Sequence, residues 1–331
     1  MKKFYIGIFI VFLAAVGFIL WHNASQKAEP PMASQPLRIG LNPWIGNGLY
    51  YVAKEKGFFE KEHINVALEN FDDSAIGKQL LNTDKIDMLP FTPETAVVLA
   101  DAGVKIKIVG ISDSSQGADG VIASKDIKTI ADLKGKKVAF EVGSPSHFFL
   151  SYFLDQHAMT TNDVAVINQP APDAGATFVA GKVDAAVTWE PWLSKASERR
   201  GGHLLISSKA MTVFPDYFIF REEFIKNHPH EARAFLRAFF NTEKYSRENQ
   251  DETIKIIAKN FKITEQEVKD QLPTFRWLSF DDNVAHLVAL QGDARQLLQI
   301  AGDLWLKLGL IKTKINANDL VDISLLKNLY Q

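Results

Sequence analysis

Residues 37–59 read LRIGLNPWIGNGLYYVAKEKGFF, and this stretch decides the fold class. Its first five residues, Leu37–Leu41, form a short apolar run that is typical of a buried strand. The next seven residues are rich in asparagine, proline and glycine, which favour a loop. A helical stretch follows and ends at Gly57. A strand, a loop and a helix in this order predict one repeat of an α/β sandwich.

The alternation of strand and helix continues along the chain. Further strands are expected at residues 64–68, 86–89, 106–111, 121–123, 136–140, 164–167 and 185–189. Helices are expected between them, and beyond residue 217 the chain becomes largely helical and closes with a helix at 318–329. This order predicts parallel strands joined by right-handed helical crossovers, with ligands bound at the carboxyl ends of the strands.

Composition excludes several classes of function. The 331 residues are 47% apolar and include 23 Phe and 6 Trp, which is enough for more than one core. The formal net charge is −2 and the charges are interspersed, so nothing points to nucleic acid. The chain has no cysteine, which excludes disulfides, thiolate metal sites, a thiol nucleophile and an acylated lipoprotein cysteine.

The amino-terminal residues predict export from the cytoplasm. Lys2 and Lys3 precede an apolar run at 4–21, as in a secretory signal peptide. The residues before Ala24 make an imperfect cleavage site, so residues 1–23 are either a signal peptide or a retained membrane anchor. Residues 24–36 are rich in Ala, Ser, Gln and Pro and predict an extended tether. The protein is therefore expected in the periplasm, with an anchor at 4–21 as an open alternative.

Several separated phrases resemble a known family. They are LRIG at 37–40 with PWIG at 43–46, YVAKEKGFF at 51–59, IADLKGKKVA at 130–139, Gly143-Ser144 with His147, and GKVDAA at 181–186 running into WEPW at 189–192. In this order they resemble the nitrate, sulfonate and taurine class of ABC-transporter substrate-binding proteins, which also includes thiamine-precursor binders. The resemblance spans residues 37–331.

The resemblance implies a type II periplasmic-binding fold, in which two αβ lobes are joined by a hinge with two chain crossings. Lobe 1 would comprise residues 37–118 and the mainly helical residues 216–331, and lobe 2 would comprise residues 119–215. The crossings are expected at 118–121 and 213–217. The ligand would bind in the cleft between the lobes.

The residue types at the expected strand ends suggest how such a cleft would bind its ligand. Loops at these ends direct helix amino termini and polar side chains toward one point. The candidate ligand-binding residues are Asn42, Trp44, Gly46, Thr92, Glu94, Asp113, Gly143, Ser144, His147, Trp189, Glu190, Asp216 and Tyr217. Carboxylates outnumber cations among them, which favours an amine, a ring nitrogen or hydroxyl groups over a purely anionic ligand such as nitrate. A sulfonate compound stays open because of the resemblance.

Each candidate also has a structural interpretation. Trp44 could belong to a packed turn, and Trp189 and Glu190 could close a core strand. Gly143 and Ser144 could be an ordinary helix start. The stretch HPHE at 228–231 resembles a metal cluster, but it opens a polar helix, so no metal and no cofactor is expected.

The leading hypothesis is a monomeric transport receptor that delivers a small molecule to an ABC permease in the cytoplasmic membrane. The alternative is a membrane-tethered sensor of the same fold that signals to a partner protein. An enzyme is not expected, because the sequence has no nucleophile elbow, phosphate-binding loop, dinucleotide fingerprint or metalloprotease helix.

Overall fold

A computed structural model describes residues 35–289, 292–327 and 329–330 of the chain. These residues belong to one compact unit, Ala33–Gln331. The predicted export segment and residues 24–34 of the predicted tether lie outside the described residues. Among the residues that are described, no helix is both long and apolar enough to cross a membrane.

The unit contains strands and helices in alternation over most of its length. The strands are β1 Leu37–Leu41, β2 Val66–Asn70, β3 Met88–Phe91, β4 Ile106–Ser115, β5 Asp119–Ser124, β6 Lys137–Phe140, β7 Ala165–Asn168, β8 Ala185–Trp189, β9 Gly202–Ser207, β10 Pro215–Arg221 and β11 Phe275–Trp277. The helices are α2 Gly48–Glu55, α3 Phe58–Lys61, α4 Ser74–Asn82, α5 Pro93–Asp101, α6 Pro145–Asp155, α7 Ala171–Val179, α8 Trp192–Ser197, α9 Glu222–Asn227, α10 Pro229–Glu248, α11 Gln250–Phe261, α12 Glu265–Gln271, α13 Phe280–Asn283, α14 Asp293–Lys307, α15 Ala317–Leu320 and α16 Ser324–Lys327.

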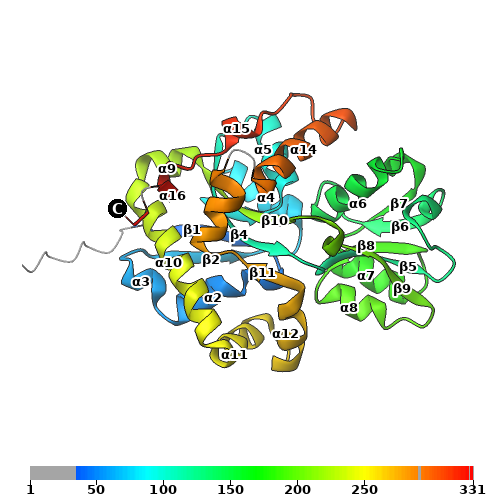
Figure 1. Cartoon of the computed structure of the whole chain (residues 1–331), viewed down its shortest axis with the longest axis horizontal. Helices are drawn as coiled ribbons and strands as arrows, with labels where there is room; N and C mark the ends of the chain where they lie inside the picture. The colour runs from blue at the N-terminus through cyan, green and yellow to red at the C-terminus, as the bar shows by residue number, and fades with distance from the viewer. Residues whose placement is uncertain (1–34, 290–291, 328, 331) are drawn as a thin grey trace, which may run out of the picture. The chain divides into compact units, whose positions relative to one another are not determined.

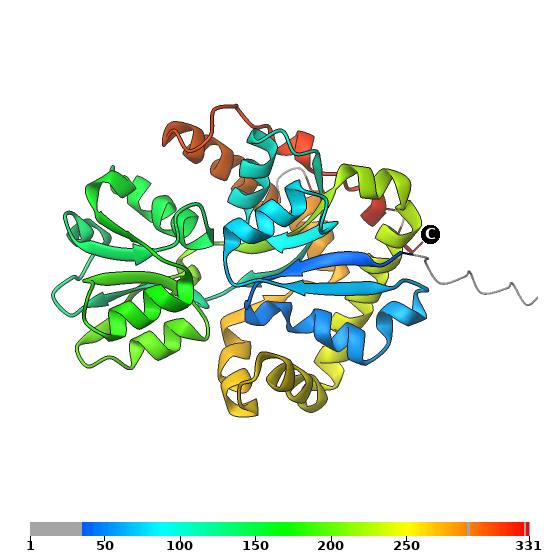
Figure 2. The ribbon, with the colours of Figure 1, turned by 180° about the vertical axis from the view of Figure 1, so that it is seen from behind.

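The strands form two separate sheets, which Figures 1 and 2 show from opposite sides. The larger sheet has six strands in the order β11-β4-β10-β3-β1-β2. The smaller sheet has five strands in the order β7-β6-β8-β5-β9. The expected α/β class with two αβ lobes is confirmed. The chain leaves the larger sheet through residues 116–118, between β4 and β5, and returns through residues 208–214, between β9 and β10.

The expectation of uniformly parallel strands is wrong for both sheets. Strands β1, β2 and β3 are parallel, as are β6, β7 and β8. However, β10 is antiparallel to β3 and β4, and β5 is antiparallel to β8 and β9. These antiparallel strands follow from the crossings, because a chain that enters a sheet from the other one arrives at the edge where the parallel strands end.

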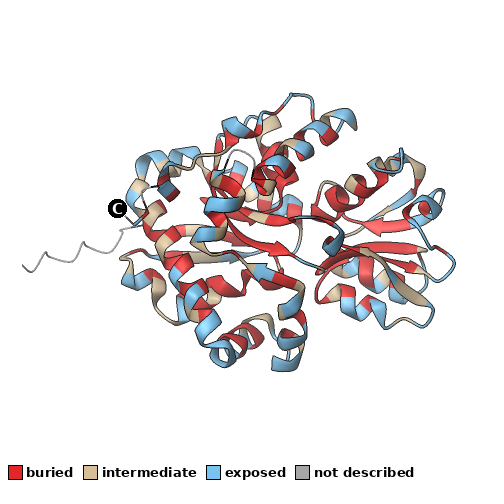
Figure 3. Ribbon diagram, viewed as in Figure 1, coloured by how far each residue is buried: buried red, intermediate tan, exposed pale blue. Residues whose placement is uncertain are grey.

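Aromatic packing covers the larger sheet. The ring centroid of Phe218 on β10 lies 5.2 Å from that of Phe235 and 4.8 Å from that of Phe239, both on α10. Helix α10 packs on α2, and α5 packs on α14 on another part of the sheet. Figure 3 shows that the strands of both sheets are mostly buried, whereas the helices expose their outer faces. The burial of these apolar faces stabilises the fold that positions the strand ends.

The carboxyl-terminal segment differs from the expected single helix at 318–329. Helix α15 ends at Leu320, and Val321 then forms an isolated parallel bridge with Ile108 of β4. Helix α16 begins only at Ser324. Asp322 donates its backbone N–H to the carbonyl of Ile108, so pairing with the edge of β4 replaces one turn of helix.

We expect a chain that begins at Leu37 to be soluble and to fold, because both sheets consist of strands that begin at Leu37 or later. Cooperative thermal unfolding, followed by circular dichroism, checks this. A chain that begins at Asn42 is the matched control: it lacks β1, which lies between β3 and β2, and should aggregate. Aggregation of the chain from Leu37, with a soluble full chain, would show that the preceding residues belong to the fold.

Candidate ligand-binding site

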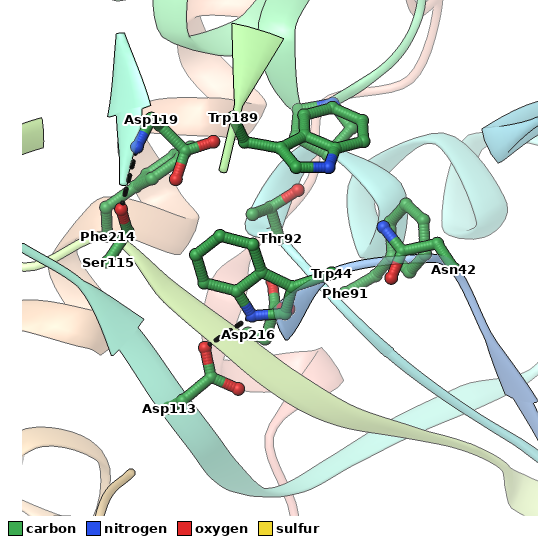
Figure 4. A pocket seen from close by; sticks show the side chains of 11 residues that line it. Asn42, Trp44, Phe91, Thr92, Asp113, Ser115, Asp119, Trp189, Phe214 and Asp216 are labelled. Atoms are coloured by element: carbon green, nitrogen blue, oxygen red, sulfur yellow. Dashed lines mark hydrogen bonds between the residues drawn. The ribbon is translucent and has the colours of Figure 1, made fainter. Parts of the chain in front are cut away.

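A cavity with about 20 Å³ of solvent-accessible space lies where the strand ends of the two sheets meet, and Figure 4 shows its lining. The lining residues are Asn42, Trp44, Phe91, Thr92, Asp113, Ser115, Asp119, Pro145, Trp189, Phe214 and Asp216. They come from the ends of β1, β3, β4 and β8, from the starts of β5, β10 and α6, and from the segment before β10. Its aromatic walls and its few convergent polar groups have the character of a small-molecule site.

Six of the sequence-predicted residues lie in this lining. They are Asn42, Trp44, Thr92, Asp113, Trp189 and Asp216. The other seven do not line it: Gly46, Glu94, Gly143, Ser144, His147, Glu190 and Tyr217. Five lining residues were missed by the sequence reasoning: Phe91, Ser115, Asp119, Pro145 and Phe214.

Trp44 is held in place by a hydrogen bond and by the close approach of the Gly46 backbone. Its indole Nε1 donates to Asp113 Oδ1 at 2.9 Å. A Cβ atom at Gly46 would lie 2.2 Å from Trp44 Nε1 and 2.9 Å from Asp113, so only glycine fits there. Trp277 Nε1 donates to the Gly46 carbonyl at 2.7 Å and fixes the same loop. Gly46 therefore acts on the cavity indirectly, by positioning Trp44.

Asp113 and Asp216 face each other across two antiparallel strands. They are a directly paired position of β4 and β10. Burial raises the pKa of Asp113 to about 6, although hydrogen bonds from Ser112 and Trp44 oppose this shift. Burial, and then the negative charge of Asp113, raise the pKa of Asp216 well above its usual range. The pair therefore resists carrying two negative charges in the empty cavity.

Asp119 and Trp189 form a second cross-strand pair, on β5 and β8 of the smaller sheet. Asp119 is 7% exposed, and burial raises its pKa to about 7. The hydroxyl of Ser115 opposes the shift, whereas the charges of Asp113, Glu94 and Glu190 add to it. Trp189 is 3% exposed, and its Nε1 has no hydrogen-bond partner among the described residues. Its N–H group is thus available to a ligand in the cavity.

Thr92 lines the cavity and connects it to a buried glutamate. Its hydroxyl donates to Glu94 Oε1 at 2.7 Å, and the hydroxyl of Thr95 reaches the same oxygen at 3.1 Å. Glu94 is fully buried in the first turn of α5, where burial raises its pKa. Its Oε2 has no partner within the described part of the chain. Glu94 lies behind the lining and adds negative charge to the cavity.

Glu190 is engaged with the start of helix α8. Its carboxylate accepts hydrogen bonds from the backbone N–H of Ser194 at 3.1 Å and from the hydroxyl of Ser194 at 2.7 Å. The peptide bond between Glu190 and Pro191 is cis. Trp189, and not Glu190, is thus the residue at this strand end that lines the cavity.

Gly143, Ser144 and His147 lie at the start of α6, beside the cavity. The backbone N–H of Gly143 donates to His147 Nδ1 at 3.0 Å, and the hydroxyl of Ser144 donates to the Glu141 carbonyl at 2.7 Å. Burial lowers the pKa of His147 to about 4, so the ring is neutral. The Gly143 N–H and the Ser144 hydroxyl are therefore used within the protein, whereas His147 Nε2 has no partner among the described residues.

Tyr217 and Asn42 differ in where their polar groups point. The hydroxyl of Tyr217 donates to the carbonyl of Ala294 at 2.6 Å, which directs the buried ring toward α14. Asn42 lines the cavity, and its Oδ1 accepts a hydrogen bond from Asn47 at 2.8 Å. The amide of Asn42 is therefore oriented with its oxygen engaged and its NH₂ group available.

The five missed residues fall into two groups. Asp119 begins β5, and Phe214 directly precedes β10, and these two strands are antiparallel to their neighbours. The rule that ligands meet the carboxyl ends of parallel strands does not find them, because an antiparallel strand presents its first residue at that edge. Phe91, Ser115 and Pro145 are each adjacent to a predicted residue or one position from an element end. For these three residues, this position is the only feature of the sequence that could have indicated a place in the lining.

Among the described residues, no group of three or more His, Asp or Glu side chains is arranged to hold a metal ion. In the HPHE stretch, His228 Nδ1 lies 3.4 Å from Glu231 Oε1, which is a pair and not a cluster.

Comparisons with known proteins agree with this architecture. The family described as NMT1/THI5 like matches residues 46–253 of the chain, which is more than half of its length. A Bacillus subtilis (strain 168) protein, named for the binding of aliphatic sulfonates, is 28% identical over 329 residues, covering 96% of this chain and 95% of that protein.

Two solved structures show the same fold. The periplasmic aliphatic sulphonate binding protein SsuA from Escherichia coli has a TM-score of 0.73 at 22% identity, covering 88% of this chain and 92% of that one. The desulfurization enzyme DSZB has a TM-score of 0.64 at 17% identity, covering 89% of this chain and 98% of that one. The fold therefore occurs in both binding proteins and an enzyme, and the site must distinguish them.

We expect the empty protein to be less stable at pH 8 than at pH 5.5. Asp119 has a folded pKa of about 7, above its unfolded value, so its stabilising contribution is full below about pH 4 and is lost as pH rises through about 7. At about 1.4 kcal/mol per unit of pKa shift, the melting temperature should fall by several degrees, measured by calorimetry.

The variant Asp119→Asn should flatten this decrease, because the amide does not ionise. Asp126→Asn, which changes an exposed aspartate in the turn after β5, is the control and should leave the decrease unchanged. A profile of Asp119→Asn that matches the parent protein would show that another group causes the effect.

Proposed function

Because the chain belongs to the NMT1/THI5-like family, we propose that it is an extracytoplasmic solute-binding protein that captures a small polar molecule between two lobes. Lobe 1 comprises residues 37–118 and 216–331, and lobe 2 comprises residues 119–215. The observation that carries the proposal is the cavity, which takes its lining from both sheets. A ligand there touches both lobes at once, and so it favours the closed arrangement over an open one.

Direct contacts between the lobes support a closing motion. Glu141, which follows β6 in lobe 2, accepts hydrogen bonds from the backbone N–H of Ser74 at 2.9 Å and from its hydroxyl at 3.1 Å. Ser74 is the first residue of α4 in lobe 1, so Glu141 interacts with the start of a helix of the other lobe. On the same helix, Lys78 Nζ donates to the Gly143 carbonyl at 2.9 Å.

A further contact lies at the outer side of this interface. Lys307 at the end of α14 forms an ion pair with Asp155 at the end of α6, with 2.6 Å between Nζ and Oδ1. The ring centroid of Trp305 on α14 lies 5.7 Å from that of His147 on α6. These contacts join the two lobes, and we propose that they stabilise the closed arrangement, which a transport partner would recognise.

The proposed partner is an ABC permease in the cytoplasmic membrane, and the proposed location is the periplasm. The location rests on the two lysines and the apolar run at 4–21. The imperfect cleavage site before Ala24 favours a second candidate, a membrane-tethered sensor of the same fold. The two candidates differ in the partner that binds the closed form, which is a permease or a signalling protein. They also differ in whether cells that carry the gene import labelled ligand.

Binding without catalysis is proposed for the cavity. The hydroxyl of Ser115 is 2.7 Å from that of Ser208 and accepts a hydrogen bond from the Asp119 backbone. The described lining residues include no histidine. A hydroxyl nucleophile activated by an adjacent histidine is thus not present among the described lining residues.

Thermal unfolding of the purified full chain with sulfonates, amines, pyrimidines and inorganic anions tests the proposal. A ligand that binds only the folded protein raises the melting temperature. Native mass spectrometry of the protein as purified adds a second measurement, because a tightly held ligand stays bound. If no small molecule of any class raises the melting temperature and none is found bound, the proposal fails.

We expect Trp44→Ala to weaken the binding of any compound found in this way by about 2 kcal/mol, or about thirtyfold in dissociation constant, because a large buried contact is lost. Trp44→Phe keeps an aromatic face but loses the bond to Asp113, and it should lose less affinity. Calorimetry measures both. Trp192→Phe, on a tryptophan outside the lining, is the control. Equal affinity in all variants would place the ligand elsewhere.

Glu141→Gln should weaken ligand binding by about tenfold, because the charge-assisted bonds to Ser74 exist only when the lobes are closed. Small-angle X-ray scattering of the empty variant should report a larger radius of gyration than in the parent protein. Asp132→Asn is the control, since Asp132 accepts hydrogen bonds only from residues 128 and 129 of its own lobe. An unchanged affinity with an unchanged radius would show that Glu141 does not stabilise closure.

A further inference from the structure

We propose that the cavity binds a small organic cation, with its ammonium group at Asp119 and Asp216 and its apolar part against Trp44 and Trp189, and that it does not bind an aliphatic sulfonate. This inference rests on the proposed function, since it specifies the ligand class of the same cavity. It differs from what the names of the sulfonate-binding relatives suggest, and it is argued from the charge, the hydrogen-bond groups and the aromatic walls of this chain.

The described lining carries three carboxyl groups and no basic side chain. It includes Asp113, Asp119 and Asp216, whereas no Lys, Arg or His is among the described residues that line it. Glu94 and Glu190 add negative charge from behind, since both raise the pKa of Asp119. The cation of Lys78 is near Glu94 and Glu141, and its Nζ donates to the Gly143 carbonyl. An anion would enter a field that opposes it, whereas a cation would relieve the repulsion among the carboxylates.

Most hydrogen-bond donors of the lining are already used. Trp44 Nε1 donates to Asp113, and the hydroxyl of Thr92 donates to Glu94. The donors that remain are the indole N–H of Trp189 and the NH₂ group of Asn42. A sulfonate has three acceptor oxygens and a full charge, and two neutral donors do not satisfy it. The carboxylate of Asp216, in contrast, has no hydrogen-bond partner within the described part of the chain.

The two helices that start at the cavity do not restore an anion site. Helix α5 has Pro93 at its first position and Glu94 in its first turn, so one N–H group is missing and an acidic side chain already interacts with the helix dipole. Helix α6 begins with Pro145, and the preceding N–H of Gly143 is bonded to His147. A proline at the first position of each helix therefore removes one of the N–H groups that usually favour anions at helix amino termini.

Trp189 provides an independent indication of a ligand. Its Nε1 is buried and unpartnered, and Figure 4 shows the nitrogen on the edge of the ring that faces the other labelled side chains. A buried donor without a partner costs free energy, which a ligand acceptor atom would recover. Trp44 and Trp189 also offer ring faces to a cation. The ligand should thus be a small molecule that combines an ammonium group with a hydrogen-bond acceptor.

Matched probes of opposite charge test the inference on the full chain. Choline and ethanolamine are compared with isethionate, and benzylamine with benzenesulfonate, by thermal unfolding and calorimetry. We expect at least one cation to bind and its matched sulfonate not to bind. Binding of the sulfonates, or only of neutral compounds, overturns the inference and leaves the proposed function standing. Absence of binding by every class of compound, with no ligand found by native mass spectrometry, overturns both.

The affinity for the cation is also measured in two variants and over a pH series. A purely structural role of Asp119 and Asp216 would not change this affinity. Asp119→Asn and Asp216→Asn should each weaken the bound cation roughly ten- to hundredfold, while the melting temperature of the empty protein stays equal or rises. Asp126→Asn is the control. As pH falls from 8 to 6, Asp119 gains a proton because its pKa is about 7, so affinity for the cation should fall. Affinity that is unchanged in both variants, or that rises on acidification, overturns the inference.

Discussion

The antiparallel pairing of β4 with β10 is the constraint on which the rest of the structure depends. The chain leaves the six-stranded sheet at the end of β4 and returns to it at the start of β10. Because these strands are antiparallel neighbours, both crossings lie side by side at the same end of the strands. The same pairing sets Asp113 opposite Asp216 and holds both at this edge. A shift in register by one residue would turn one of the two carboxylates to the other face of the sheet. The β4–β10 pair thus belongs both to the two chain crossings and to the candidate site.

The cavity concentrates buried carboxylates, which a stable fold otherwise avoids. Asp113 is 1% exposed and Asp119 is 7% exposed, and burial raises the pKa of each. Hydrogen bonds from Ser112 and Trp44 lower the pKa of Asp113 and so oppose the effect of burial. For Asp216, the causes other than burial are all neighbouring negative charges, which raise its pKa further. Groups that destabilise the empty protein and gather in one cavity are typical of a functional site, because selection for stability alone would remove them.

The sequence predicted the fold class because strand, loop and helix leave a local pattern, as in residues 37–59. It located Trp44, Asp113, Trp189 and Asp216 because these residues end or begin such elements. Asp119 was missed, since no local pattern reveals that β5 is antiparallel. Glu190 was expected in the cavity, but its hydrogen bonds to Ser194 depend on the conformation after a strand, which residue types do not determine. Side-chain partners that are distant in the sequence require the structure.

In the proposed closing motion, two opposing interactions would act between the empty lobes. The bonds from Ser74 to Glu141, and from Lys78 to the Gly143 carbonyl, join the two lobes and would favour closure without a ligand. The proposed closure would also bring Asp119 of the five-stranded sheet near Asp113 and Asp216 of the six-stranded sheet. The charge of Asp113 raises the pKa of Asp119, and the charges of Asp113 and Asp119 raise the pKa of Asp216. At short range in a poorly solvated site, this repulsion is on the order of kcal/mol. A cation between the carboxylates would reverse its sign, whereas an anion would increase it. The charge of the ligand, more than its size, would therefore determine which molecules close the protein.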